Sequence, residues 1–179
     1  MALEPWPIVA TTDVGERILA AADDLFYSRG ITAVGVELIA EEARTTKRTL
    51  YQRFGSKDGL VEAYLRRRGH RWQRYLVDHL DATDWTVTEF FRRAEQWAES
   101  HDRGCAFVNA WAEVGGAGET GAAEAVRDEK RWMRELFLTF AGGDRATAPA
   151  GPQLRGGGRG RGAGPGGTDA VPFAGQAAR

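Results

Sequence analysis

Residues 45–54 read TTKRTLYQRF. Thr45 or Thr46 can accept a backbone N–H group as the cap of a helix that continues through Tyr51 and Phe54. Leu50 and Phe54 are four residues apart, so they share one face of that helix. The stretch therefore predicts a short helix that buries one apolar side and presents a polar, basic side.

The flanking sequence predicts three more helices around this one. One runs from a cap at Thr12 or Asp13 to Gly30, which supplies the stop. A shorter one contains Val36, Leu38, Ile39 and Ala43. After a break at Gly55-Ser56, a long helix begins at Lys57 and keeps an apolar stripe for more than five turns. The stripe consists of Leu60, Tyr64, Leu65, Trp72, Leu76 and Leu80.

The rest of the chain predicts an all-α fold. Residues 84–98, 104–114 and 120–141 are each apolar on one side at helical spacing, and no segment keeps the two-residue alternation of a half-buried strand. The expected organisation is a flexible arm at 1–11, a three-helix domain at 12–56 and a second helical domain at 57–141. Residues 142–179 are rich in glycine and proline, and we expect this tail to be disordered.

Charge and cysteine content restrict the function. The net charge is −1, yet residues 43–74 contain ten Lys or Arg and only two acids, and nucleic acid responds to such a local field. The single Cys105 cannot form an internal disulfide and has no ligand partners at zinc spacing, so we expect a reducing cytoplasmic compartment and no metal. Cys105 itself is expected to be a buried small side chain. The N-terminus has no signal-peptide pattern, and no segment is long and apolar enough to span a membrane.

The longer string IAEEARTTKRTLYQRFGSKDGLVEAYL, residues 39–65, resembles the TetR family of helix-turn-helix transcriptional regulators. The similarity covers roughly residues 14–65 and comprises an Ile-Ala pair, a tight turn, a Thr-Leu-Tyr centre, and then Phe, Ser-Lys and Leu. It implies a recognition helix in the major groove of a double-stranded DNA operator. It also implies a ligand-responsive repressor that binds a palindromic operator as a homodimer. Activation of transcription is the alternative to repression.

The residue types suit those implied roles. Lys47 or Arg48 can donate to guanine O6 and N7, whereas hydroxyl and cationic groups suit phosphate oxygens. Lys57 stands at a helix N-terminus, where backbone N–H groups also favour an anion. The full set of expected DNA contacts is Thr45, Thr46, Lys47, Arg48, Thr49, Tyr51, Gln52, Arg53 and Lys57.

Two other groups of basic residues are not included in this set of DNA contacts. The family usually has Gly where this chain has Arg44, so either the turn differs or Arg44 is tolerated and adds a phosphate contact. The arginines of the long helix are expected to form a solvated face and not to contact DNA. They are Arg66, Arg67, Arg68, Arg71 and Arg74.

The resemblance also implies a pocket for a small-molecule inducer in the second half. Its side chains predict an apolar or aromatic ligand, with ordinary core packing as the alternative for each residue. The expected lining is Phe90, Trp97, Phe107, Asn109, Trp111 and Met133. We expect no enzyme and no cofactor: His101 beside Asp102 indicates a polar turn, and no nucleophile is paired with a base.

The tail at 142–179 leaves alternatives open. Family members normally end in two amphipathic helices that form the dimer interface, and the segment GPQLRGGGRGRGAGPGGTDA is not of that kind. A shifted reading frame would explain it and would leave a truncated, ligand-binding fragment that dimerises poorly. RNA binding through Arg155, Arg159 and Arg161 is a further alternative, against a passive tail.

Overall fold

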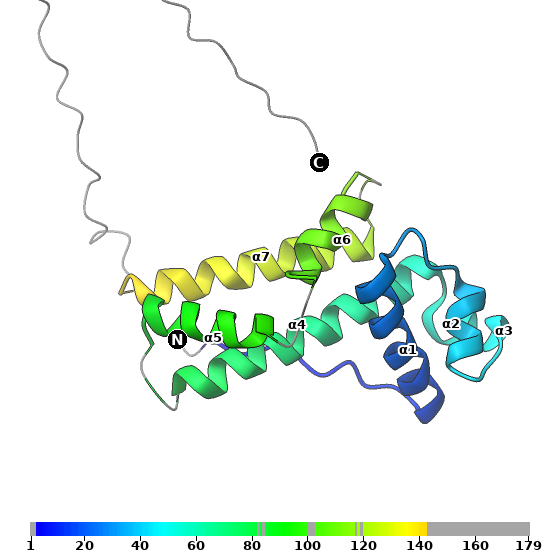
Figure 1. Ribbon diagram of the computed structural model, residues 1–179, viewed down its shortest axis with the longest axis horizontal. Helices are drawn as coiled ribbons and strands as arrows, with labels where there is room; N and C mark the ends of the chain where they lie inside the picture. The colour runs from blue at the N-terminus through cyan, green and yellow to red at the C-terminus, as the bar shows by residue number, and fades with distance from the viewer. Residues whose placement is uncertain are drawn as a thin grey trace, which may run out of the picture. The chain divides into compact units, whose positions relative to one another are not determined.

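The computed structural model describes residues 3–81, 83, 85–99, 103–116, 118 and 120–142. Within these ranges the chain forms seven α-helices and no strand, which confirms the predicted all-α class (Figure 1). The helices are α1 (Asp13–Arg29), α2 (Val36–Glu42), α3 (Lys47–Phe54), α4 (Lys57–Asp81), α5 (Val87–Glu99), α6 (Ala106–Val114) and α7 (Gly121–Phe140).

Threonine caps set where several helices begin. The hydroxyl oxygens of Thr12, Thr46 and Thr120 accept the N–H groups of Gly15, Thr49 and Ala123 at 3.3, 3.1 and 3.2 Å. Each bond satisfies one of the backbone donors that a helix start leaves unpaired. Thr86 does the same for Glu89 at 3.2 Å, so α5 begins three residues later than the predicted residue 84.

The turn between α2 and α3 depends on Arg44. Its φ of 51° makes it the single residue other than glycine with positive φ in the described ranges. The N–H of Arg44 donates to the Glu41 carbonyl and that of Thr45 to the Ala40 carbonyl, both at 2.9 Å. Arg44 therefore adopts the left-handed geometry of a helix-turn-helix turn, and of the two predicted outcomes the structure shows the one in which it is tolerated.

One core cluster joins α1, α2, α3 and the start of α4, and it extends to parts of α6 and α7. Leu50 is fully buried in it, and Phe54 packs against it from a half-buried position. The same cluster contains Leu25, Phe26 and Ile39, the neighbours that the sequence predicted for these two side chains. The buried side of α3 is thereby fixed, and its opposite side is left to solvent.

The second half is organised around the long helix α4. Helix α7 lies along α4, and α5 packs against the C-terminal part of α4 (Figure 1). A second buried cluster fills the space between the three helices, and its members are Leu76, Leu80, Phe90, Trp132 and Leu136.

Residues 3–11, here called the N-terminal strap, are extended and tied to α4 and α7. The Trp6 N–H donates to Gln73 Oε1 at 2.8 Å, and Trp132 Nε1 donates to the Glu4 carbonyl at 2.9 Å. Gly69 makes room for the Trp6 ring, because a Cβ at that position would lie 2.4 Å from Trp6 Cζ3. The sequence predicted a flexible arm here. The structure instead shows a hydrogen-bonded segment, because the buried Gln73 side chain on α4 accepts the backbone N–H of Trp6.

Several predictions fall outside the described residues. They concern the His101-Asp102 turn and everything assigned to the tail after Gly142, including Arg155, Arg159 and Arg161. Among the helices that the structure describes, none combines the length and apolar character needed to cross a bilayer.

Candidate nucleic-acid interface and ligand cavity

Helix α3 presents a polar face to solvent. At 100° per residue, Lys47, Arg48, Tyr51 and Gln52 fall within about 140° of its circumference, and all four are exposed. Leu50 points to the other side, into the core. The structure thus brings four of the nine predicted DNA contacts together on one face of α3.

The remaining predicted DNA contacts border this surface. Thr45 lies in the turn before α3, Thr46 is the helix cap, Thr49 is half-buried and Lys57 opens α4. Thr46 already uses its oxygen, since it accepts the N–H of Thr49 and lies 2.9 Å from Thr49 Oγ1. Thr46 therefore has a structural role beside any contact with DNA.

Four cations around α3 have no acidic partner in the part of the chain that the structure describes. They are Arg44, Arg48, Arg53 and Lys57. Side chains that neutralise phosphates have to be available in this way, because each ion pair within the protein competes with DNA.

Lys47 is the exception on this face. Its Nζ donates to Glu37 Oε1 of α2 at 2.5 Å and lies 5.8 Å from the centroid of the Tyr51 ring. The hydrogen bond to Lys47 holds the pKa of Glu37 below its ordinary value, and the same bond raises the pKa of Lys47. Because both side chains are exposed, the pair is weak, and Lys47 can leave Glu37 for a stronger acceptor.

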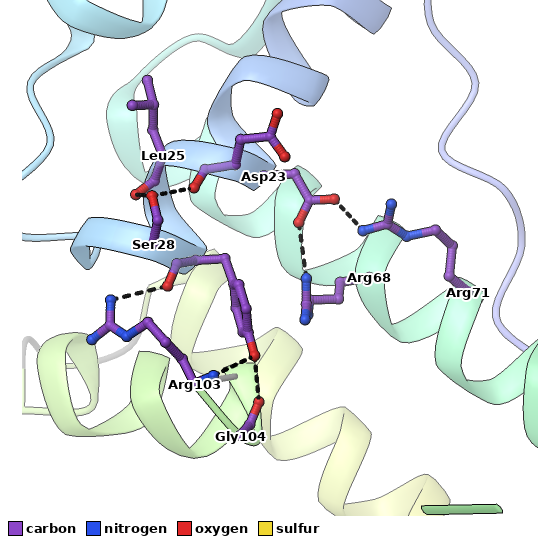
Figure 2. A network of polar contacts seen from close by, with 9 residues as sticks. Asp23, Leu25, Ser28, Arg68, Arg71, Arg103 and Gly104 are labelled. Carbon is purple, nitrogen blue, oxygen red and sulfur yellow. Dashed lines mark hydrogen bonds and ion pairs between the residues drawn. The ribbon is translucent and has the colours of Figure 1, made fainter. Parts of the chain in front are cut away.

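The arginines of α4 all have acidic partners, and the predicted solvated face holds only for the exposed Arg71 and Arg74. Arg66 pairs with Glu62 and Asp128, Arg67 with Glu16, and Arg74 with Asp78. Figure 2 shows Arg68 and Arg71 directed at Asp23 of α1. Arg68 is buried, and its guanidinium also lies 4.1 Å from the centroid of the Tyr27 ring. Sequence reasoning missed the pairs with Glu16, Asp23 and Asp128, because these acids lie far away along the chain. The pairs with Glu62 and Asp78 span only four residues.

A cavity of about 230 Å³ lies between α4, α5, α7 and the segment that leads into α6. Its walls are mainly apolar and aromatic, with two buried ionisable side chains, Arg68 and Glu129. The lining residues are Arg68, Trp72, Ala94, Trp97, Ala98, Gly104, Cys105, Ala106, Phe107, Glu129, Lys130 and Met133.

Three of the six predicted pocket residues line this cavity, namely Trp97, Phe107 and Met133. Phe90 is buried instead in the cluster between α4, α5 and α7. Asn109 donates from Nδ2 to the Arg103 carbonyl at 2.9 Å, and Trp111 is 45% exposed beside α7. Only the first turn of α6 reaches the cavity, which is why the later positions do not line it.

Glu129 is the charged group that sequence reasoning missed. Its side chain is almost fully buried, and its Oε2 accepts a hydrogen bond from Gln73 Nε2 at 2.5 Å. Burial raises the pKa of this carboxyl to about 7. The sequence held a signal, because Glu129 lies three residues after Val126 and four before Met133, on the apolar stripe of α7.

Cys105 also differs from its expected environment. It is exposed and borders the cavity, because it immediately precedes the first residue of α6 and is not part of a packed helix face.

The cavity and the helix-turn-helix unit are joined by polar contacts. Tyr27 of α1 donates from its hydroxyl to the Gly104 carbonyl at 3.2 Å, and the Arg103 N–H donates to the same hydroxyl at 3.0 Å. Glu113 of α6 accepts the N–H of Thr32 at 2.7 Å. Since Arg68 and Gly104 both line the cavity, its walls are bonded directly to α1.

Comparison with known proteins agrees with this arrangement. Residues 18–64 match the family model described as bacterial regulatory proteins, tetR family. An uncharacterised HTH-type transcriptional regulator of Mycobacterium tuberculosis, Rv1255c, is 35% identical over 78 residues, and the match spans 43% of this chain and 39% of that protein. The chain thus covers less than half the length of this curated relative.

Solved structures resemble a larger part of the chain. SCO4454, a TetR-family transcriptional regulator from Streptomyces coelicolor, superposes with a TM-score of 0.64 at 27% identity, over 73% of this chain and 66% of that one. A putative regulator of the same type from Streptomyces avermitilis gives 0.61 at 28% identity, over 73% of each chain. Reduced NemR from E. coli, at 0.50, 23% identity and 75% and 73% coverage, bears on the fold alone.

The residues that match the family model contain α2 and α3, and therefore include the exposed face of α3. Residues 18–64 of this chain thus form a helix-turn-helix domain of the TetR family of bacterial regulatory proteins.

Proposed function

We propose that the chain is a sequence-specific DNA-binding transcriptional regulator, a repressor that a small molecule releases from its operator. The observation that carries the proposal is the exposed face of α3, formed by Lys47, Arg48, Tyr51 and Gln52. A recognition helix needs such a face in order to enter the major groove, with its N-terminal residues toward base edges.

The unpaired cations supply the affinity that does not depend on sequence. Arg44 precedes α3, Arg53 lies in its last turn and Lys57 opens the next helix, so cations at both ends of α3 are available to phosphates. Lys47 would exchange Glu37 for a base or phosphate when DNA binds. We assign the nine predicted contacts to DNA and add Arg44 as a phosphate contact.

Binding as a homodimer to a palindromic operator is part of the proposal. One helix-turn-helix unit neutralises few phosphates, whereas two units reach half-sites about 34–36 Å apart and gain steeply in affinity. The regulatory half exposes apolar side chains of the kind that a subunit interface covers, among them Val108, Trp111 and Leu138.

The response to ligand would pass from the cavity to α1. Arg68 lines the cavity and bonds to Asp23, so a ligand that shifts Arg68 or the Gly104 segment also shifts α1 and, through the shared core, α3. A target on DNA also places the protein in the cytoplasm.

The test combines sedimentation of the purified chain with a titration of a palindromic duplex from its own upstream region at two salt concentrations. We expect a dimer that binds this duplex far more tightly than a random one, with affinity falling steeply as salt rises. A monomer with weak binding that is indifferent to sequence would overturn the proposal.

A further inference from the structure

The cavity wall combines aromatic rings with a buried carboxyl. Trp72 and Trp97 lie 5.3 Å apart between ring centroids at an interplanar angle of 56°, and Phe107 and Met133 complete the apolar lining. Electron-rich ring faces of this kind attract an organic cation, tryptophan most strongly.

Glu129 receives one hydrogen bond, from Gln73, and is also stabilised by the charge of the neighbouring, exposed Lys130. Gln73 is held in one orientation, because its Oε1 accepts the Trp6 N–H at 2.8 Å and its amide nitrogen must then face Glu129. Among the described residues Glu129 forms no ion pair. An ionised carboxylate has room for several donors, and a single amide leaves most of that capacity unused.

The other charges around the cavity are already engaged or reach solvent. On α4, Arg68 is bound to Asp23 and lies over Tyr27. On α7, Lys130 is exposed, and α5 contributes only Ala94, Trp97 and Ala98. The segment before α6 adds the Cys105 thiol. Glu129 is therefore the buried charge that a ligand can still neutralise.

We propose that this cavity binds a small organic cation with an aromatic or alkyl body, whose charge is held by Glu129 between Trp72, Trp97 and Phe107. The inference rests on the proposed ligand response and names the class of ligand. The volume of about 230 Å³ is below the 300–1,000 Å³ range typical of drug-sized ligands, so the ligand is compact.

The test uses three small aromatic probes that differ in charge. Benzyltrimethylammonium is the cation, neopentylbenzene is its neutral isostere and phenylacetate is the anion. Binding to the full chain is measured by calorimetry and tryptophan fluorescence without DNA, so the outcome does not depend on whether the chain binds an operator.

We expect the cation to bind most tightly, and Glu129→Gln to weaken it by about tenfold or more while the neutral isostere is unaffected. Glu135→Gln, an exposed position on the same helix, is the matched control and should bind like the wild type. A second measurement needs no variant: cation affinity of the wild type should rise by about tenfold from pH 6 to pH 8, as Glu129 ionises, and that of the isostere should not.

Three results would overturn the inference. The first is equal binding of the cation by the wild type and a folded Glu129→Gln variant. The second is a preference for phenylacetate, which would assign the charge recognition to Arg68. The third is failure of the folded wild type to bind the cation at millimolar concentration. A loss of operator binding with cation binding intact would count against the proposed function alone.

Discussion

Arg68 of α4 donates from its guanidinium to Asp23 of α1 at 3.1 Å, and the same side chain lines the cavity. The side chains of both residues are largely buried, at 8% and 13% exposure. One contact thus joins the surface that a ligand would touch to the first helix of the DNA-binding unit.

Removing Asp23 should be costly. Asp23→Ala leaves the buried Arg68 charge without its partner, and we expect the free energy of unfolding to fall by about 3 kcal/mol. Urea unfolding followed by circular dichroism measures this. Asp78→Ala, which breaks the exposed pair with Arg74, is the matched control and should change stability by less than about 1 kcal/mol. Similar losses in the two variants would contradict a structural role for the Arg68–Asp23 pair.

Gly69→Ala should release the N-terminal strap. Alanine normally favours a helix by up to about 1 kcal/mol over glycine, but here its Cβ would meet the Trp6 ring at 2.4 Å. We therefore expect a net destabilisation of about 1–2 kcal/mol in thermal melts, with altered Trp6 fluorescence. In a chain that also carries Trp6→Ala, alanine at position 69 should give a higher thermal stability than glycine. If Gly69→Ala alone stabilises the chain, the strap is not packed as described.

Glu129 should make stability depend on pH. The folded chain holds the Glu129 proton up to a pKa of about 7, compared with an ordinary value of 4.5, so between these values it binds more protons than the unfolded chain. Its contribution to the free energy of unfolding then falls as pH rises through this window, by roughly 3 kcal/mol in total. Glu129→Gln should match the wild type near pH 4.5 and be more stable at pH 8. Parallel pH profiles for the two proteins would refute this.

Arg48 and Lys57 should affect DNA binding differently. Arg48→Ala removes a proposed base contact, so we expect discrimination between the operator and random DNA to shrink by about 1–3 kcal/mol. Lys57→Ala removes a proposed phosphate contact, so all duplexes should weaken alike and the salt dependence should decrease by about one ion. Fluorescence anisotropy on both duplexes at several salt concentrations separates the two. Equal effects on both duplexes from both variants would mean that α3 enters the groove in another register.

Arg44→Gly should raise the stability of the chain and lower its affinity for DNA. Glycine adopts the φ of 51° without the cost of about 1 kcal/mol that a side chain carries there, so the chain should become slightly more stable. The variant also loses an unpaired cation beside α3, and its affinity for every duplex should fall. Arg44→Lys is the control: it keeps the charge and the strained backbone, so neither quantity should change much. Unchanged affinity in Arg44→Gly would remove Arg44 from the DNA interface.

The sequence alone predicted the helices and the exposed face of α3. Their signals are local: a threonine cap satisfies donors within one turn, as Thr12, Thr46 and Thr120 do, and an apolar stripe repeats with the period of the helix. The buried positions of Leu50 and Phe54 followed from four-residue spacing. The family resemblance of residues 39–65 then assigned that face to DNA.

The tertiary structure decided the cavity and its connections. Trp6, Gln73 and Glu129 are far apart in the chain and meet only because α7 and the strap pack on α4. The same holds for Arg68 and Asp23, which form a buried ion pair where the sequence predicted a solvated arginine. Periodicity tells which side of a helix is buried, but not which partner a charged residue finds there, because that depends on contacts between distant segments.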